Sequence, residues 1–504
     1  MKISITFFLL FSVFTSCANK NKDSHAIKEN LNKPNIIIIN LDDLGYGDLS
    51  CYGATEIKTP NIDKLANNGL LFTNGYATSA TCSPSRFSLL TGVYPWRNKR
   101  AKILAGDAPL LIDTAQQTLP KLLNKAGYNT AIIGKWHLGL GSGHVNWNNT
   151  ITPGPNQVGF NESYILAATQ DRVPTVYIHN GNVVNLDKTD PIQVNYKKNF
   201  LGEPTALSNP ELVTMKWHHG HNNSIVNGIP RIGFMKGGEN AKWSDIDMAD
   251  HFLGKAKDFI KSNKNTDFFL YYAMQQPHVP RTPHPRFVGK SGMGPRGDAI
   301  LEADWCVGEL LKTLKNLDVL NNTLIVFTSD NGPVLNDGYF DEAEEKLGKH
   351  DPKGGLRGGK YSLFEAGTRV PFITYWPGVI KSGVSQALVC QIDLLASLGC
   401  LVGEEVNATD SKNILKAFTG KSNQGRDHLI IEAKSRTALR SGDWVMIPAY
   451  KGNPINSKVN IETGILPKYQ LYNLKTDRAQ KHNLASENPE KLNAMIKIFK
   501  NLKS

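Results

Sequence analysis

The segment 82–86, with sequence CSPSR, has the most distinctive chemistry in the chain. Pro84 suits the first turn of a helix, and Gly92 suits its end. Cys82 would then lie at a helix N-terminus, where free N–H groups and the helix dipole stabilise an anion. Arg86 is four residues further on and shares a helix face with Cys82, so its guanidinium can reach back to an anion or a nucleophile. The pattern predicts a site that handles an anionic group.

A second group of residues offers oxygen ligands for a metal ion. Asp42 and Asp43 directly follow one apolar run, and Asp330 and Asn331 follow another. An all-oxygen set suits a hard cation, either calcium or magnesium. Clustered carboxylates without a cation would repel one another and raise each other's pKa. A turn explains either pair alone, but a pair at each of two predicted strand ends favours a metal site.

Lysine and histidine side chains follow further apolar runs. Lys135 and His137 are two residues apart, so they point to the same face if the predicted strand continues through them. His278 comes after the run at 268–272, and Lys360 lies in a glycine-rich turn where the backbone can approach a ligand closely. A single histidine is more often a hydrogen-bonded structural residue. The recurrence of polar residues after apolar runs favours one shared site.

The apolar runs predict the elements that would position these residues. Continuous runs rich in β-branched and aromatic residues are typical of strands buried on both faces of a parallel sheet, and they occupy 35–41, 130–133, 268–272 and 324–327. Helical patterns cover 118–125, ended by Gly127, and 299–317. The alternation predicts an α/β fold with a large, doubly wound, mostly parallel sheet flanked by helices. Such sheets bind ligands beyond the carboxyl ends of their strands, where the polar residues fall.

The remaining chain divides into two further regions. Residues 150–245 are rich in Asn, Pro and Gly, which predicts long loops and an inserted lobe over the sheet. From about residue 425 the pattern changes to short strands and a closing helix, with strands expected at 429–431, 444–447 and 469–472 and the helix at 491–502. We therefore expect a catalytic α/β domain over 34–425 and a smaller C-terminal α+β subdomain over 426–504.

The N-terminus resembles an export signal. Lys2 precedes an apolar run over 3–14 that is too short to span a bilayer. Small residues before Cys17 resemble a bacterial lipoprotein cleavage box, with Phe14 in place of the usual Leu. We expect a signal peptide over 1–17, a lipid on Cys17, a polar tether over 18–33, and a location in the periplasm or at the cell surface. An ordinary secretory signal is the alternative.

Composition restricts the partners. The net charge of +12 favours polyanions such as sulfated glycans, and no block of consecutive Lys and Arg supports nucleic-acid binding. The four cysteines without a proposed role are not arranged as CxxC pairs, which argues against a zinc site; they are Cys51, Cys306, Cys390 and Cys400. A disulfide among them is compatible with export but cannot be assigned from the sequence.

The motifs together resemble a known family. Cys-x-Pro-Ser-Arg followed by Leu-Leu-Thr-Gly is similar to the signature of the type I sulfatases, within the alkaline phosphatase superfamily. Further blocks follow in the family's order: NLDDLGYGD (40–48), GKWHLG (134–139), QPH (276–278), SDNG (329–332) and LRGGK (356–360). The resemblance covers most of the chain. Within the family, the chain resembles bacterial polysaccharide sulfatases.

The resemblance implies a reaction and a cofactor. A separate formylglycine-generating or anaerobic sulfatase-maturating enzyme would oxidise Cys82 to Cα-formylglycine, whose hydrate attacks the sulfur of a sulfate ester. Arg86 would steady this group, His137 would help it to eliminate sulfate, and His278 would protonate the leaving alcohol. Lys135 and Lys360 would bind the sulfate. One calcium ion would be held by Asp42, Asp43, residue 82, Asp330 and Asn331.

The substrate implied is a sulfated carbohydrate: an algal polysaccharide such as ulvan or carrageenan, a glycosaminoglycan, or mucin. A phosphomonoester or phosphodiester hydrolase on the same scaffold is the nearest alternative, although two lysines and one metal suit the smaller charge of a sulfate ester. A thiol phosphatase would require Cys-x5-Arg rather than the Cys-x3-Arg present here. An inactive glycan-binding protein is the remaining alternative, although no expected catalytic position is substituted.

Several polar residues are weaker candidates for the substrate pocket. Solvated or surface loops are the favoured interpretation for Asp171, Arg172, Trp217 to His221, Asp337 to Tyr339, and His350.

Overall fold

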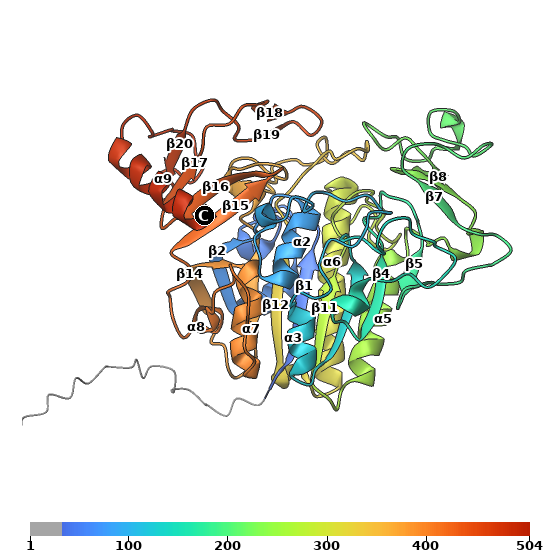
Figure 1. The fold of residues 1–504 in the computed structure, drawn as a ribbon, viewed down its shortest axis with the longest axis horizontal. Coiled ribbons are helices and arrows are strands. Elements are labelled where there is room, and N and C mark those ends of the chain that lie inside the picture. The colour runs from blue at the N-terminus through green and yellow to red at the C-terminus, as the bar shows by residue number, and fades with distance from the viewer. Residues whose placement is uncertain (1–32) are drawn as a thin grey trace, which may run out of the picture. The chain divides into compact units, whose positions relative to one another are not determined.

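The structure, a computed structural model, describes residues 33–504, and its centre is a ten-stranded mixed sheet (Figure 1). The strands lie in the order β14 (Gly383–Cys390), β2 (Leu70–Tyr76), β13 (Phe372–Tyr375), β12 (Thr323–Ser329), β1 (Asn35–Leu41), β11 (Phe268–Ala273), β3 (Asn129–Lys135), β4 (Glu162–Leu166), β5 (Tyr177–His179) and β6 (Asn182–Val183). The predicted signal peptide, lipidated Cys17 and almost all of the tether lie outside the described residues.

The middle of the sheet is parallel. Strands β12, β1, β11, β3 and β4 run in one direction, while β13, β5 and β6 are antiparallel to their neighbours. Every residue of β1 and β12 is buried, as expected for strands covered on both faces. The prediction of a large, mostly parallel sheet is therefore confirmed.

Helices cover both faces of the sheet. One face packs against α2 (Cys82–Thr91), α3 (Leu119–Lys125), α7 (Leu394–Val402) and α8 (Leu415–Phe418), and the other against α1 (Pro60–Asn68), α5 (Met248–Ser262) and α6 (Gly294–Asn316). Alternate side chains of β1 enter the two cores: Ile36 and Ile38 one, Ile37 and Ile39 the other. A short helix, α4 (Pro155–Val158), precedes β4. Residues 33–504 contain no helix long and apolar enough to cross a membrane.

The helix α2 places Cys82 at the carboxyl ends of the parallel strands. It begins at Cys82, and Gly92 ends it with φ 65°, a left-handed conformation that glycine adopts without strain. All ten of its side chains are buried, so the first turn is rigidly held. The prediction of a helix between these two residues is confirmed.

Residues 150–245 are more regular than predicted. Three of its strands, β4, β5 and β6, extend the central sheet, so the interpretation as loops and a separate lobe was wrong for 162–183. The rest of this region forms small two-stranded sheets from β7 (Gln193–Asn195), β8 (Ile225–Val226), β9 (Ile229–Pro230) and β10 (Phe234–Lys236). Strands of two to five residues among Asn and Gly lack the long apolar run that makes a strand recognisable.

The C-terminal region forms a separate antiparallel sheet, as expected. Its order is β15 (His428–Ala433), β16 (Arg436–Ser441), β17 (Trp444–Ile447) and β20 (Gln470–Asn473), with α9 (Pro489–Lys503) in contact with β16 and β17. A hairpin of β18 (Ile455–Asn456) and β19 (Ile461–Glu462) projects from it. β16 was not predicted because polar and charged residues make up most of it. The exact domain boundary stays a prediction.

We predict that Gly134→Ala destabilises the fold. Gly134 lies in β3 beside Lys135 with φ 113°, and an added Cβ would be 2.0 Å from the carbonyl oxygen of Ala273 in β11. Strain and overpacking should cost about 2 kcal/mol or more. Gly254→Ala in α5 is the control, because that position is open and helical, and it should stabilise by roughly 0.5–1 kcal/mol. Thermal melting of both variants measures this; equal melting temperatures would contradict the packing argument.

Candidate active site

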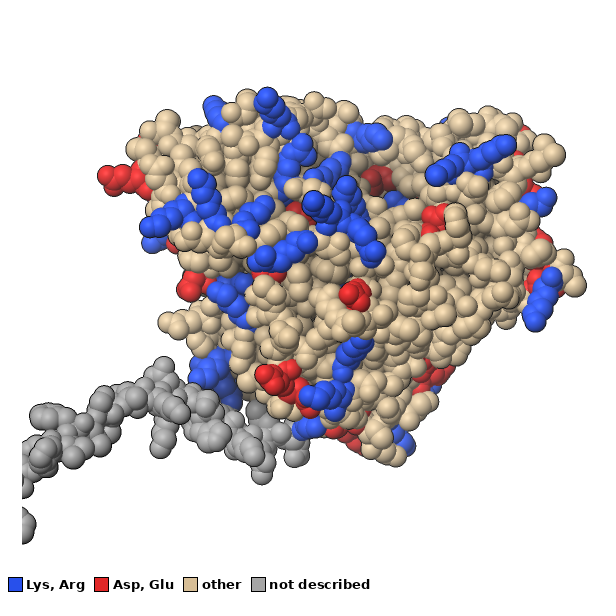
Figure 2. All heavy atoms as spheres, viewed as in Figure 1, with Lys and Arg blue, Asp and Glu red and all other residues tan. Residues whose placement is uncertain are grey.

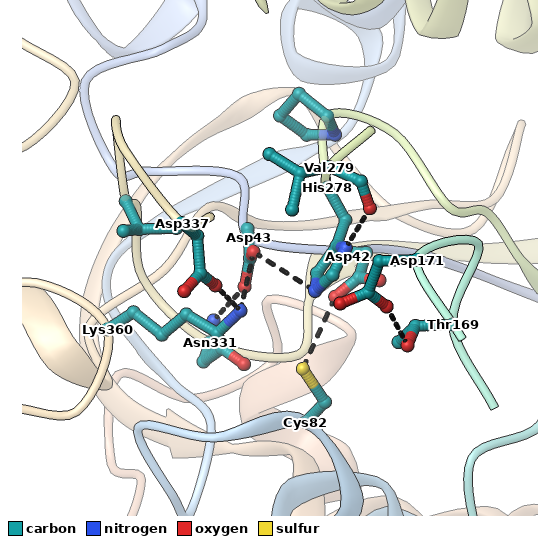
Figure 3. Close-up of polar contacts among 12 residues, drawn as sticks. Asp42, Asp43, Cys82, Thr169, Asp171, His278, Val279, Asn331, Asp337 and Lys360 are labelled. Carbon is teal, nitrogen blue, oxygen red and sulfur yellow. Dashed lines mark hydrogen bonds and ion pairs between the residues drawn. The ribbon is translucent and has the colours of Figure 1, made fainter. Parts of the chain in front are cut away.

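Cys82 lies among buried polar groups at the carboxyl edge of the parallel strands (Figure 3). Its Sγ is 3.5 Å from Oδ1 of Asp42, at the end of β1. Possible ligand atoms of Asp42, Asp43, Cys82 and His278 all lie within 4.8 Å of one another. Three distant stretches of sequence therefore meet at the start of α2.

Two buried lysines pair with the carboxylates that follow β1. Nζ of Lys135, the last residue of β3, is 2.5 Å from Oδ2 of Asp42. Nζ of Lys360 donates to Oδ2 of Asp43 and to Oδ2 of Asp337, each at 2.8 Å. Although burial acts to raise it, Lys360 and His278 hold the pKa of Asp43 well below its ordinary value. Its cationic neighbours thus keep the carboxylate of Asp43 charged.

Arg86 contacts a carboxylate rather than the cysteine. Its Nε donates to Oδ2 of Asp330 at 2.8 Å, and its Nη1 donates to the carbonyl oxygen of Lys135 at 3.3 Å. The sequence predicted that Arg86 reaches an anion or a nucleophile, and in the structure it contacts an anion, the buried carboxylate of Asp330. Its catalytic role stays a prediction. Burial and the neighbouring Asp42 raise the pKa of Asp330 to about 6.

The oxygen atoms beside Cys82 suit a hard divalent cation. Asn331 donates from Nδ2 to Oδ1 of Asp43 at 2.7 Å and to the carbonyl oxygen of Gly332 at 2.9 Å. Its Oδ1 is buried and has no hydrogen-bond partner among the described residues, which is the state expected of a metal ligand. Asp330 lies beside this group, with Oδ1 3.3 Å from the backbone nitrogen of Asp43. The predicted ligand residues therefore come together.

His137 has a different backbone conformation from the one expected. β3 ends at Lys135, and His137 has φ 54°, so the idea that the two side chains share a strand face was wrong. Its Nε2 lies 2.9 Å from the carbonyl oxygen of Leu104, which can only accept, so Nε2 carries the hydrogen. Nδ1 is buried and has no partner among the described residues. Burial and Lys135 lower the pKa of His137 well below its ordinary value, which leaves a neutral ring with a free acceptor nitrogen.

His278 points its second nitrogen at the acidic residues. Nδ1 donates to the carbonyl oxygen of Val279 at 2.6 Å, and Nε2 is 3.7 Å from Oδ2 of Asp43. Burial and the nearby Lys360 lower the pKa of His278 to about 4, so the ring is neutral without substrate. An anionic ester beside it would favour the protonated form.

A pocket of about 190 Å³ opens over Cys82, His137, His278 and Lys360. The sequence-based interpretation of solvated loops was wrong for much of its wall. Asp171, Arg172, Asp337 and residues 219–221 all line it.

A hydrogen-bond network fixes this wall. Nε2 of His221 is 2.8 Å from Oδ2 of Asp171, and Arg172 donates to the other oxygen at 2.8 Å. Tyr339 lies behind the wall, with its ring centroid 4.6 Å from that of His221. His350 lies elsewhere: it is buried and contacts Asp48 at 2.8 Å, so it belongs neither to the pocket nor to a surface loop.

Sequence analysis missed several residues of the pocket, namely Ile103, Ile232, Tyr361 and Lys458. Tyr361 follows the predicted Lys360, and its position next to that residue was the one usable signal. Lys458 lies between β18 and β19, far along the chain, where nothing in the sequence connects it with the site.

Burial makes Cys82 unsuitable as a thiolate nucleophile. It raises the pKa of the Cys82 thiol well above the ordinary value, whereas reactive cysteines have lowered pKa values. The other described cysteines, Cys51, Cys306, Cys390 and Cys400, are also free, so no disulfide joins any of the five.

The fold and site define a class of hydrolase, and comparison with known proteins agrees. The family model described as Sulfatase matches residues 34–404. The N-acetylgalactosamine-6-O-sulfatase of Bacteroides thetaiotaomicron is 48% identical over 98% of this chain and 97% of its own. Human N-acetylgalactosamine-6-sulfatase is 32% identical over 76% of this chain and 65% of its own.

Solved structures are similar in the same way. A Bacteroides thetaiotaomicron protein solved in a study of glycosaminoglycan metabolism has a TM-score of 0.93 and 49% identity, covering 94% of this chain and 99% of its own. A phosphonate monoester hydrolase of Agrobacterium radiobacter shares the fold alone, with a TM-score of 0.56 and 17% identity over 93% of this chain and 95% of its own. The chain belongs to the sulfatase family. It is a sulfuric ester hydrolase.

We predict that removing divalent metal lowers the melting temperature of the protein. Without a cation, Asp42, Asp43 and Asp330 lose part of the charge that balances them. A chelator should lower the melting temperature of the wild type by several degrees and that of Asn331→Leu by much less, since this variant lacks one ligand oxygen. A wild-type melting temperature that is insensitive to both chelator and added metal would contradict a metal site here.

Proposed function

We propose that this sulfatase removes the 6-sulfate from N-acetylgalactosamine at the end of a sulfated glycosaminoglycan. The observation that carries the substrate assignment is the 48% identity, over nearly the whole of both chains, to a bacterial N-acetylgalactosamine-6-O-sulfatase. The pocket of about 190 Å³ is smaller than the ~300 Å³ and upward of typical ligand sites, which suits one terminal sulfated sugar. A glycosaminoglycan is preferred here over the algal polysaccharides and mucin.

The nucleophile in this proposal is made from Cys82 by a separate maturation enzyme, which oxidises the side chain to Cα-formylglycine. The aldehyde adds water to give two hydroxyl groups. One hydroxyl gives its proton to the carboxylate of Asp42, whose Oδ1 lies 3.5 Å from Sγ of Cys82, and its oxygen forms a bond to sulfur as the bond from sulfur to the alcohol oxygen breaks. A covalent sulfate is left on residue 82. His278 gives the departing alcohol a proton.

Release of sulfate regenerates the aldehyde. The second hydroxyl of residue 82 loses its proton to His137, its oxygen forms the C=O bond, and the bond from carbon to the sulfate oxygen breaks. The buried ring of His137, with its unpartnered Nδ1, supports this role as base. Lys135 and Lys360 attract the sulfuryl oxygens, and Arg86 holds Asp330 in place beside residue 82.

The metal in this proposal is calcium rather than magnesium. Asp42, Asp43, Asp330, Asn331 and residue 82 would hold it, and carboxylate and amide oxygens suit the larger, more flexible coordination of calcium. When bound, the ion would supply positive charge to balance the sulfuryl oxygens.

We assign selection of the sugar to the part of the pocket wall that Asp171, Arg172 and His221 form. Asp171, Arg172 and His221 form a buried network of hydrogen bonds with fixed positions, and such a network can distinguish the orientation of a sugar hydroxyl. Export and a lipid anchor at Cys17 complete the proposal; they rest on the sequence pattern of residues 1–17 alone.

We predict that Cys82→Ala keeps the fold and loses turnover. The side chain is small and capped by neighbours, so the melting temperature should change little, whereas kcat on the sulfated sugar should fall by more than about a thousandfold. Cys51→Ala, half-buried and outside the pocket, is the matched control and should retain activity. Substantial turnover by Cys82→Ala would refute the assigned nucleophile.

Substrate preference provides the direct test of the proposed activity. The matured enzyme should release sulfate from N-acetylgalactosamine 6-sulfate with a kcat/KM about a hundredfold or more above that for the 4-sulfate isomer. It should also turn over nitrophenyl sulfate faster than nitrophenyl phosphate. Preference for the 4-sulfate would overturn the sugar assignment, and preference for phosphate would favour the phosphoester alternative.

A further inference from the structure

A second groove opens beside the active-site pocket. It has a volume of about 370 Å³ and lies between the start of α2, residues 101–103 and the turn that joins β15 to β16. Ile103 lines both cavities and is 36% exposed, so the groove begins where the pocket ends. The C-terminal subdomain thus supplies one wall of a cavity that adjoins the reacting centre.

Unpaired positive charge lines this groove. Lys102 and Lys434 are exposed, and neither forms an ion pair with any residue from 33 to 504. Burial lowers the pKa of Lys434; Asp337 acts to raise it, and the nearby Lys458 and Arg436 act to lower it further. Figure 2 shows Lys and Arg gathering on the upper left of this face, where Figure 1 places the C-terminal strands. The nearby carboxylate of Asp337 is already paired with Lys360, so positive charge is in excess here, and an excess of positive charge suits an anionic ligand.

The acidic side chain that lines the groove, Glu432, is buried and forms a hydrogen bond to the backbone of the adjacent turn. Glu432 is 2% exposed, and its Oε1 accepts a hydrogen bond from the backbone nitrogen of Ser435 at 2.6 Å. Glu432 therefore fixes the β15–β16 turn and forms no ion pair with Lys102 or Lys434.

The turn that presents Lys434 has an unfavourable backbone. Ala433 pairs with Arg436, so Lys434 and Ser435 form a two-residue turn, with φ 48° and 66°. Asn and Gly are strongly preferred in such turns because both positions are left-handed. A lysine in this conformation carries local backbone strain, and such strain clusters at functional sites.

A short series of contacts joins Lys434 to the reacting centre. Its Nζ lies 4.6 Å from the ring centroid of Tyr361, and the Tyr361 hydroxyl donates to Oδ2 of Asp337 at 3.2 Å. Asp337 in turn pairs with Lys360 at 2.8 Å. A ligand at Lys434 is therefore next to a ligand at Lys360, with Tyr361 between them.

We propose that this groove binds the anionic sugar that follows the terminal sulfated sugar in the glycan chain. Lys102 and Lys434 would bind the carboxylate or sulfate of that second sugar, and Ile103 would pack against its ring. The inference rests on the proposed function in one respect, namely that the terminal sulfated sugar occupies the pocket. The enzyme would then bind two consecutive sugars and would select a polyanionic chain over a neutral one.

Kinetics on substrates of two lengths test the groove. The double variant Lys102→Gln with Lys434→Asn removes both charges, and asparagine suits the left-handed turn better than lysine does. The substrates are N-acetylgalactosamine 6-sulfate and a trisaccharide in which the same sugar precedes a uronic acid. The ratio of kcat/KM for trisaccharide to that for monosaccharide should fall about tenfold in the double variant, the size expected for a charge-assisted hydrogen bond.

Two matched controls isolate the charge. Ser435→Gly relaxes the same turn while keeping both lysines. Lys381→Gln removes an exposed lysine just before β14, at the amino ends of the parallel strands and so away from the carboxyl ends where the site lies. Both variants should keep the wild-type ratio of kcat/KM for the trisaccharide to kcat/KM for the monosaccharide. If this ratio is unchanged in the double variant, or falls equally in Ser435→Gly, the proposal is overturned.

A binding measurement separates this proposal from the proposed function. In the Cys82→Ala background, calorimetry with a hexasaccharide of alternating uronic acid and N-acetylgalactosamine 6-sulfate reports binding without turnover. The double variant should weaken this binding about tenfold and more at low salt than at high salt. If the double variant loses binding while the matured wild-type enzyme is inactive on the monosaccharide, the proposed function is refuted but the groove is supported. If the Cys82→Ala protein does not bind the hexasaccharide at all, the groove is refuted.

Discussion

The site depends on mutual neutralisation of charges that are buried at the carboxyl edge of the sheet. Asp42 pairs with Lys135, Asp43 with Lys360, and Asp330 with Arg86, and all six side chains are almost fully buried. An isolated buried charge costs several kcal/mol, so each member requires its partner. Because every pair joins distant parts of the chain, the pairs hold the ends of β1, β3 and β12 and the start of α2 in one arrangement.

This constraint also explains how the site handles an anion. The lysines that neutralise the carboxylates lie beside Cys82 and next to the pocket, where a sulfate ester would need positive charge. The unpartnered Oδ1 of Asn331 and the carboxylates of Asp42 and Asp43 leave oxygen atoms for a cation. The same polar cluster thus supports both the fold and the binding of an anionic group.

The sequence predicted the parts that depend on continuous patterns. Long β-branched runs identified β1, β3, β11 and β12, and polar residues after those runs identified Asp42, Lys135 and Asp330. This worked because the carboxyl ends of parallel strands meet at one edge of a sheet whatever their separation in sequence. The cysteine helix was equally clear, since its start and its final glycine both have local causes.

The parts that failed depend on tertiary contacts. β16 contains two arginines and a serine, and β4 to β6 are short, so neither shows an apolar period. Helix spacing predicted that Arg86 can reach an anion, but it did not reveal that this anion is the buried carboxylate of Asp330. The pocket wall at 219–221 and the contribution of Lys458 depend on how loops fold back over the sheet, and no local signal reports that.

The central claim is that all these charges are arranged around a chemically altered residue 82. Mass spectrometry of the peptide that contains residue 82, taken from enzyme with measured sulfatase activity, tests this most directly. The account predicts a peptide that has lost sulfur and gained an aldehyde oxygen, in proportion to the activity of the preparation. Full activity in a preparation whose residue 82 is entirely unmodified cysteine would contradict it.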